Sequence, residues 1–326
     1  MKLGQLFTQI FAFLFIKVTF GIRNDGDTCT QFISQEDILR SFDYPIDINN
    51  TINENTDLTY ARTNKNGEIT FLQIADQQSI SSSISCLYYL TEIRVIRTKS
   101  FDLKQFPQYL QSLYLSHVDM SSHSNDLHRF HYLEYLHITH TNLQFVPWIN
   151  TLHRLKYLIL DHNDLHFLSA TTIRLKELIK IDVTDNPHLK SLDMLNNHPK
   201  LQQIIASSCS ITHLPKNLPQ LVELQLKNNL ISSLDNLETL GQETVIPKFF
   251  IFENNQIDKL NRLMQVKNLH TVNVRNNNLQ TIPLKLLCGR KELKHILISH
   301  NPAANYRGYK DDIQILKRCL PNTEID

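Results

Sequence analysis

LKYLILDHNDLHFL, residues 155 to 168, gives the clearest indication of how this 326-residue chain folds. We predict a short strand over residues 157–161, which points Leu158 and Leu160 inward. Asn163 would then turn the chain, and Leu165 would carry it back over the same core. The stretch therefore predicts one coil of a solenoid. Its spacing fits neither the helical period of about 3.6 residues nor simple strand alternation: Leu155, Leu158, Leu160, Asn163, Leu165 and Leu168.

Similar stretches recur along the chain, and they must, because one coil cannot bury its own apolar edge and has to stack on copies of itself. Together with the central stretch they start at Leu110, Leu133, Leu155, Leu178, Leu201, Leu221, Pro247, Leu269 and Leu293. The intervals are 23, 22, 23, 23, 20, 26, 22 and 24 residues. Residues 69–103 add two coils with a degraded pattern. We therefore expect about eleven coils over residues 69–301.

This pattern resembles the leucine-rich repeat superfamily, in its secreted form with short repeats. The resemblance implies an α/β fold: a right-handed solenoid, or horseshoe, with parallel strands on its concave face. Coils of this length are too short for full helices, so we expect irregular or 3₁₀ returns on the convex face. Residues 22–68 would form an N-terminal cap and residues 302–326 a C-terminal cap over the open ends of the core.

Six asparagines stand at the turn position of their coils. An inward carboxamide satisfies backbone groups of its own turn and of the adjacent coil, so we interpret these residues as a structural ladder: Asn163, Asn186, Asn229, Asn255, Asn277 and Asn301. Val118 takes the position once, and because valine forms no side-chain hydrogen bond we expect a distorted turn there. Pro247 replaces the first leucine after the 26-residue interval, where we expect a protruding loop near Gly241.

The N-terminal residues have a different composition from the rest. Lys2 precedes the apolar run LFTQIFAFLFIKVTFG, which ends at residue 21 and resembles a secretory signal peptide; a buried first helix is the alternative. No later stretch is apolar for long enough to span a membrane. Lys and Arg number 33 against 32 for Asp and Glu, so no net field favours nucleic acid. We expect a secreted protein, and Asn49 lies in its one glycosylation sequon.

Five cysteines fit an oxidising compartment. Cys29 and Cys86 lie near one end of the repeats, and Cys288 and Cys319 lie near the other. We hypothesise one disulfide at each end, although sequence alone does not fix the connectivity. Cys209 occupies the turn position that asparagine takes in other coils, and we predict that it is free and buried.

Side chains that flank the inward leucines should line the concave face. We propose this face as a partner-binding surface, rich in His, Tyr and Asp at its N-terminal end, and its candidate residues are Tyr114, His117, Tyr135, His137, His140, Tyr157, Asp161, His162, Asp185, Lys227, Glu253 and Arg275. A zinc site among His117, His140, His162 and Asp161 is a weaker alternative, because neighbouring stacked histidines are too parallel for tetrahedral ligation. Another alternative is a binding surface that responds to pH, because imidazole titrates near neutrality.

Catalytic motifs are missing from the sequence, which contains no phosphate loop, nucleophile elbow, HExxH or CxxC. Ser116-His117 and Ser299-His300 are neighbours on a strand, so we expect their side chains to diverge. We therefore predict a protein that is not an enzyme, uses no cofactor or metal, and binds a protein or glycoconjugate in defence or adhesion. The alternatives are an extracellular-matrix component and, without a signal peptide, an intracellular scaffold.

Overall fold

The computed structural model describes residues 28–48, 58–121 and 124–326. The proposed signal peptide and Asn49 lie outside these residues. None of the helices in the described part has the length and hydrophobicity that crossing a lipid bilayer requires.

One sheet of fourteen strands runs along the molecule, with the strands paired in chain order. All neighbours are parallel except β2 and β3, which are antiparallel. The strands are β1 (Asp47–Ile48), β2 (Tyr60–Thr63), β3 (Ile69–Ala75), β4 (Glu92–Ile96), β5 (Ser112–Ser116), β6 (Tyr135–Thr139), β7 (Tyr157–Ile159), β8 (Lys180–Asp182), β9 (Gln203–Ile205), β10 (Glu223–Gln225), β11 (Lys248–Ile251), β12 (Leu269–Asn273), β13 (His295–Leu297) and β14 (Glu324–Ile325).

Most returns between strands contain a short 3₁₀ helix, whereas the return between β9 and β10 is irregular and the one between β12 and β13 contains the short helix α3 (Leu284–Leu287). Irregular or 3₁₀ returns were predicted from the coil lengths. The 3₁₀ helices are η1 (Thr28–Gln31), η2 (Ser82–Cys86), η3 (Leu103–Gln105), η4 (Ser124–Arg129), η5 (Pro147–Thr151), η6 (Ala170–Arg174), η7 (Asp193–Leu195), η8 (Leu237–Thr239), η9 (Asn261–Gln265) and η10 (Pro302–Asn305). The α-helices are α2 (Gln35–Arg40), α3 (Leu284–Leu287) and α4 (Tyr309–Cys319).

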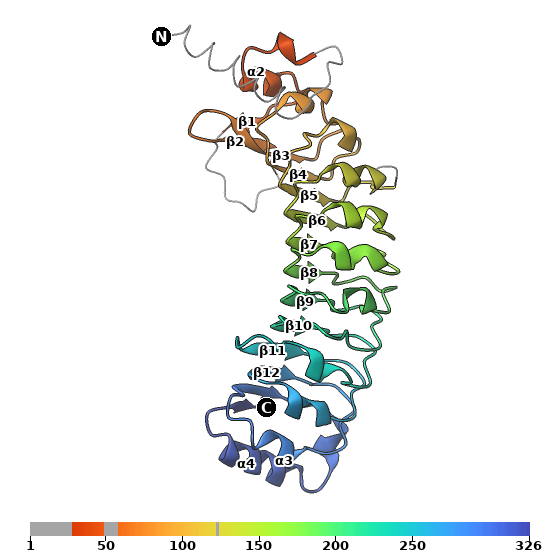
Figure 1. The fold of residues 1–326 in the computed structure, drawn as a ribbon, viewed down its shortest axis with the longest axis vertical. Helices are drawn as coiled ribbons and strands as arrows, with labels where there is room; N and C mark the ends of the chain where they lie inside the picture. The colour runs from red at the N-terminus through yellow and green to blue at the C-terminus, as the bar shows by residue number, and fades with distance from the viewer. Residues whose placement is uncertain (1–27, 49–57, 122–123) are drawn as a thin grey trace.

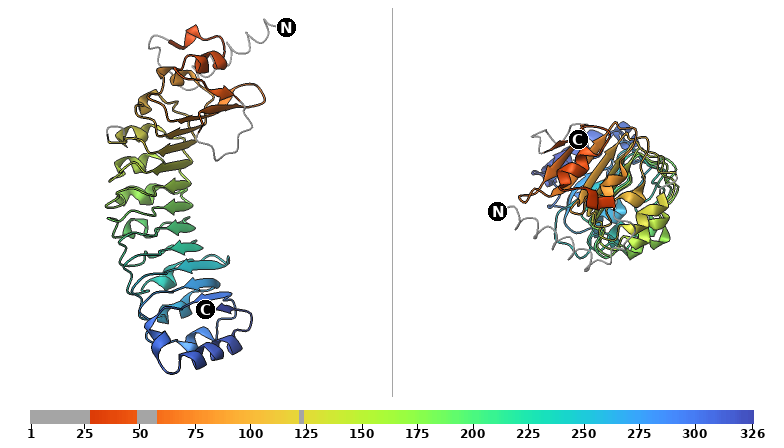
Figure 2. Two further views of the ribbon diagram at one scale, coloured as in Figure 1. Left: turned by 180° about the vertical axis from the view of Figure 1, so that it is seen from behind. Right: turned by 90° about the horizontal axis from the view of Figure 1, so that it is seen from above.

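The coils stack into an open right-handed solenoid. Figure 1 shows the strands along one side, the 3₁₀ turns along the other, and a gentle bend with the strands on its inner side. Seen along the axis in Figure 2, successive coils lie over one another. We call the surface formed by the outward side chains of β3 to β13 the strand face. The inward positions form one continuous core, since Leu158, Leu224 and Val272 are all fully buried.

The asparagine ladder holds each turn to the coil before it. The amide of fully buried Asn186 donates to the carbonyl oxygens of Leu160 in the preceding coil, at 2.9 Å, and of Val183 in its own, at 2.8 Å. Its side-chain oxygen accepts the backbone N–H of Leu165 at 2.9 Å. The same two-coil pattern occurs at Asn163, Asn229, Asn255, Asn277 and Asn301.

Cys209 occupies a ladder position where the side chain has to donate one hydrogen bond to the preceding coil but does not have to accept one. It is free and buried, as predicted, and its thiol donates to the carbonyl oxygen of Val183 at 3.3 Å. In the preceding coil one extra residue separates Asn186 from the next inward leucine, Leu189. The N–H of Leu189 therefore bonds to the carbonyl of Asn186 at 3.0 Å. Because that N–H already has an acceptor, a thiol suffices where other coils use a carboxamide.

The turn at Val118 is not distorted, contrary to our expectation. His117, the residue before it, has φ 53°, close to the 54° of His140 and the 52° of His162. The N–H of His117 still donates to the carbonyl of Thr139 in the next coil at 3.2 Å. Backbone bonds between coils thus define this turn, and the buried valine only fills space.

The first-leucine position after the long interval is filled by Lys248, which corrects our assignment of Pro247. Pro247 is exposed, whereas Lys248 is fully buried and pairs with Leu269 across a register shift. Its Nζ donates to the carbonyl oxygens of Lys267, at 2.7 Å, and of Thr244, at 3.3 Å. Burial lowers the pKa of this lysine. The loop before it protrudes, with Val245 86% exposed.

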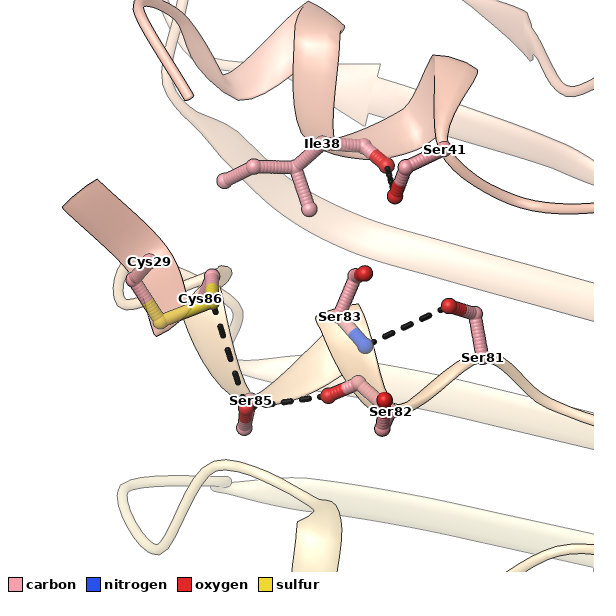
Figure 3. Close-up of a disulfide and its surroundings, with 8 residues drawn as sticks. All are labelled: Cys29, Ile38, Ser41, Ser81, Ser82, Ser83, Ser85 and Cys86. Carbon is pink, nitrogen blue, oxygen red and sulfur yellow. Dashed lines mark hydrogen bonds between the residues drawn. A yellow bond between two sulfur atoms is a disulfide. The ribbon is translucent and has the colours of Figure 1, made fainter. Parts of the chain in front are cut away.

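Each end of the solenoid carries a helix and a disulfide. At the N-terminal end, Ser34 caps α2, and Cys29 is bonded to Cys86 in η2 (Figure 3). At the C-terminal end, Cys288, just after α3, is bonded to Cys319 in α4. These are the two disulfides that we hypothesised. Helices α2 and α4 bury apolar side chains against the end coils and so shield the core from water.

His198 is a buried imidazole whose environment favours its neutral form. It is fully buried, and its Nε2 lies 2.9 Å from the carbonyl oxygen of Leu175. Its Nδ1 has no hydrogen-bond partner among the described residues. Burial, partly offset by the bond to Leu175, lowers its pKa below the ordinary value of about 6.5. Protonation of this side chain therefore opposes folding.

His198→Gln should reduce the loss of stability in acid. Below about pH 6.5 the unfolded chain binds more protons at this position than the folded chain, so stability falls as pH decreases towards the lowered folded-state pKa. Glutamine keeps an N–H donor for Leu175 and does not titrate. Melting temperatures measured between about pH 7.5 and 5.5 should fall less in this variant than in the wild type. Exposed His153→Gln is the control; an equal pH slope in all three proteins would contradict the prediction.

A candidate partner-binding face

The predicted surface histidines His117, His140 and His162 belong to a column of residues that lies at the ends of the strands and serves a backbone role. Its members adopt the left-handed conformation, with φ between 47° and 59°, and turn the chain out of each strand. Asn, Asp and His are enriched in this conformation, which explains the composition of the column. Each member directly precedes a ladder position: Asp76, Arg97, His117, His140, His162, Asp185, Ser208, Asn228, Asn254, Asn276 and His300.

This backbone reversal corrects the expectation that neighbouring serine and histidine side chains diverge. Ser116 Oγ lies 2.9 Å from Nδ1 of His117, and Ser299 Oγ lies 3.0 Å from Nδ1 of His300. In a continuous strand successive side chains point to opposite faces. A left-handed second residue returns its side chain towards the first. The contact is therefore a consequence of the turn, and the absence of enzymatic activity stays a prediction.

Three imidazoles of the column form a stack along one edge of the strand face. The ring centroids of His117 and His140 are 4.2 Å apart with an interplanar angle of 11°, and those of His140 and His162 are 4.5 Å apart at 14°. These near-parallel rings match the geometry that weighed against a tetrahedral zinc site there. Burial, together with the neighbouring His117 and His162, lowers the pKa of His140. The shift favours the neutral form of the middle ring.

A chain of imidazoles and carboxylates continues from the stack. Asp161 binds His137 Nε2 at 2.8 Å through one carboxylate oxygen and His162 Nδ1 at 2.7 Å through the other. His162 uses its Nε2 to reach Asp185 at 3.0 Å. Burial acts to raise the pKa of Asp161, but the hydrogen bonds from His137 and His162 outweigh it and hold the pKa well below its usual range. The network fixes the orientation of His137.

Four rings cluster on strands β5, β6 and β7, in the N-terminal half of the strand face and beside the histidine stack. Tyr114 contacts His137 edge to face at 4.6 Å between centroids, Tyr135 lies 6.4 Å from His137, and Tyr135 lies 6.3 Å from Tyr157. Tyr157 is 38% exposed, and the other three rings are partly buried. We call these four residues the aromatic cluster. It presents rigid apolar area with polar tips to the solvent.

The candidate residues of the C-terminal half pair mainly with other charged side chains. Lys227 Nζ lies 3.2 Å from a carboxylate oxygen of Glu253, on the neighbouring coil. Arg275 forms an ion pair with Asp326, which follows β14. The structure therefore unites the N-terminal candidates into one connected group and separates Lys227, Glu253 and Arg275 from it.

An open groove lies beside the histidine stack, along the turns that follow β5 and β6. Its volume is about 820 Å³, and its lining includes His117, His140, Asn142, Gln144 and Phe145. The groove belongs to the turns that follow the strands. Sequence reasoning missed it, because these turn residues share no pattern across coils.

Comparison with known proteins rests on the fold. No protein-family model and no curated protein sequence matches the chain. Among solved structures, an internalin from Listeria monocytogenes is 19% identical, with 76% of this chain and 77% of that chain covered and a TM-score of 0.55. A leucine-rich repeat protein from Leptospira interrogans is 20% identical, with 77% and 76% covered and a TM-score of 0.56. This chain has a leucine-rich repeat fold.

A third similar leucine-rich repeat structure is larger. Drosophila Toll, solved in complex with Spätzle, is 19% identical, with a TM-score of 0.54. The match covers 70% of this chain and 35% of the Toll chain. At these low identities the structural similarity shows the leucine-rich repeat architecture alone. The function has to be inferred from the exposed residues.

Proposed function

We propose that this leucine-rich repeat protein binds a protein partner through the N-terminal half of its strand face. The observation that carries the proposal is the aromatic cluster, in which side chains from three adjacent strands make one contiguous patch. Tyrosines contribute a large share of interface energy at small entropic cost, because their rings have few rotatable bonds. The similar Toll chain was solved with a protein ligand, which supports a protein over a glycoconjugate.

The aromatic cluster is organised before any partner arrives. Asp161 holds His137 at 2.8 Å, and His137 in turn packs against Tyr114. A side chain that is already ordered loses less conformational entropy on binding. The C-terminal half of the strand face offers less, because Lys227 and Arg275 already form ion pairs.

We also propose that the protein acts outside the cell, in defence or adhesion. Two disulfides within the described residues support an oxidising compartment. The test is recovery of the protein from culture medium with Ile22 or a close neighbour as its first residue, and with a glycan on Asn49. A reduced protein confined to the cytosol would support the intracellular scaffold instead.

Tyr157→Ala and Tyr135→Ala should each weaken partner binding by more than about 1 kcal/mol. The partner is first captured from the native fluid, and its dissociation constant is then measured by titration calorimetry. Phe249→Ala is the matched control, because Phe249 lies on β11 in the C-terminal half and is also 38% exposed. Loss of affinity in the control but not in the tyrosine variants would place the site elsewhere on the strand face. A captured ligand that is a glycan would reject the protein partner.

A further inference from the structure

Asp164, His166 and His188 converge at the turn edge of two neighbouring coils. Each offers one ligand atom, and these atoms lie within 4.8 Å of one another. Nδ1 of His188 is 2.5 Å from a carboxylate oxygen of Asp164. Among the described residues this is the one group of three His, Cys, Asp or Glu side chains that meets such a criterion. The group lies outside the proposed partner-binding face.

The asparagine turns and one extra residue create the convergence. Asp164 directly follows Asn163, and Leu165 comes next. In the next coil Pro187 and His188 separate Asn186 from Leu189, so this coil has one residue more between asparagine and leucine. Both asparagines are buried and anchored to the neighbouring coil. The additional residue brings His188 out to the surface beside Asp164.

Neighbouring side chains contact this group. The ring of His166 lies between those of Phe145, at 5.7 Å and an interplanar angle of 26°, and His188, at 5.1 Å and 14°. The second carboxylate oxygen of Asp164 accepts a hydrogen bond from Nε2 of Gln144 at 3.2 Å. An amide bonded to a ligating carboxylate is the kind of outer contact that orients metal ligands.

The carboxylate and imidazole chain of the strand face lacks this convergence. Asp161 uses one oxygen for His137 and the other for His162, so these histidines approach different sides of the carboxylate. His162 likewise uses both ring nitrogens, one for each aspartate. An ion at that place would have to break an extended network. At Asp164 an ion would replace only the bonds that His166 and His188 make to this one residue.

We propose that Asp164, His166 and His188 bind one divalent transition-metal ion of the zinc type. Imidazole nitrogen suits zinc, copper and nickel, whereas calcium and magnesium prefer oxygen ligands. Zinc binds nitrogen and carboxylate oxygen at about 2.0–2.2 Å, which places two ligands of one ion roughly 3.3 Å apart. The two imidazoles stack at an interplanar angle of 14°, close to the geometry that weighed against zinc in the histidine stack, so one ring has to rotate to point its nitrogen at the ion. Unlike that stack, this group already brings a carboxylate and both imidazoles within 4.8 Å of one another, and both rings are exposed. Three protein ligands leave a fourth position for water.

The test is calorimetric titration of the untagged, disulfide-bonded full chain with zinc chloride near neutral pH. We expect one zinc ion per chain, with at least about tenfold weaker binding in His166→Ala and in His188→Ala, as for the loss of a metal ligand or its support. His213→Ala is the control, because His213 is an exposed imidazole paired with a single carboxylate, Asp193, at 2.9 Å. This control should bind zinc as the wild type does.

Two further readings separate the site from adventitious binding. Zinc should raise the melting temperature of the wild type and of His213→Ala, but not that of His188→Ala, because a ligand stabilises only the fold that binds it. Both ligand histidines are exposed, so the apo variants should melt like the wild type. Absence of zinc binding at about 100 μM, or binding that neither His166→Ala nor His188→Ala weakens, would overturn the proposal.

Discussion

Gly241→Ala should lower the free energy of unfolding by about 2–5 kcal/mol. Gly241 has φ 67°, a left-handed conformation that costs an alanine about 1–2 kcal/mol. A Cβ atom would also clash with Cε of buried Lys248 and with the carbonyl oxygen of Leu221. The lysine stem has some room to move, whereas the carbonyl belongs to the backbone at the start of the coil that contains Gly241. The expected loss is therefore large, and urea unfolding monitored by circular dichroism measures it.

Gly67→Ala is the matched control for this substitution. Gly67 has φ 79°, and no heavy atom lies within 4 Å of the position of an added Cβ. The loss of stability in Gly67→Ala should therefore contain the cost of the left-handed conformation but no cost from a clash. The added substitution Lys248→Ala should not restore Gly241→Ala to the level of Gly67→Ala, since the clash with Leu221 remains. Equal losses in the two glycine variants would show that close packing at Gly241 does not matter.

Removing either disulfide should destabilise the solenoid by about 4 kcal/mol. The bonds close chain segments with sequence separations of 57 for Cys29–Cys86 and 31 for Cys288–Cys319. The cross-link restricts the unfolded chain, and the entropy gained without it depends only weakly on loop length. The double variants Cys29→Ala/Cys86→Ala and Cys288→Ala/Cys319→Ala test each bond separately. Denaturant titration of both proteins measures the loss.

The position of the damage should differ between the two double variants. In a solenoid each coil contacts only its neighbours, so hydrogen exchange should accelerate first near β3 in one variant and near β13 in the other. Cys209→Ala is the control, with an expected loss of about 1 kcal/mol from one missing donor. Reduction of the wild type should reproduce the combined loss. Uniform acceleration along the whole sheet in both variants would argue against independent end caps.

Periodic positions were predictable because each depends on its own coil. The repeat places the inward side chains of every strand in the shared core, and three of them are fully buried: Leu158, Leu224 and Val272. The ladder role of Asn186 follows from the same spacing. Lys248 was not predictable. The inward position usually requires an apolar residue. Here the carbonyl oxygen of Thr244, just before the strand, and that of Lys267, just before the next strand, both lie within reach of its Nζ.

The candidate site was predictable in composition but not in geometry. Tyr135, His137 and Tyr157 were placed on the strand face by alternation alone, and the structure brings them together there. His117, His140 and His162 were predicted on the concave face with the tyrosines, and their turn conformation was not foreseen, because a positive φ leaves no clear signal in one coil. The enrichment of their column in Asn, Asp and His across coils was the available clue.

The coil and the single shared interior follow from the sequence alone, because leucines at a fixed interval can be buried only by stacking. Which polar side chains meet depends on the tertiary structure. Asp164 and His188 are separated by a full coil in sequence, and so are His137 and Asp161. Their contacts depend on the register between neighbouring coils. That register is set by backbone hydrogen bonds and ladder asparagines, which carry no information about the exposed side chains beside them.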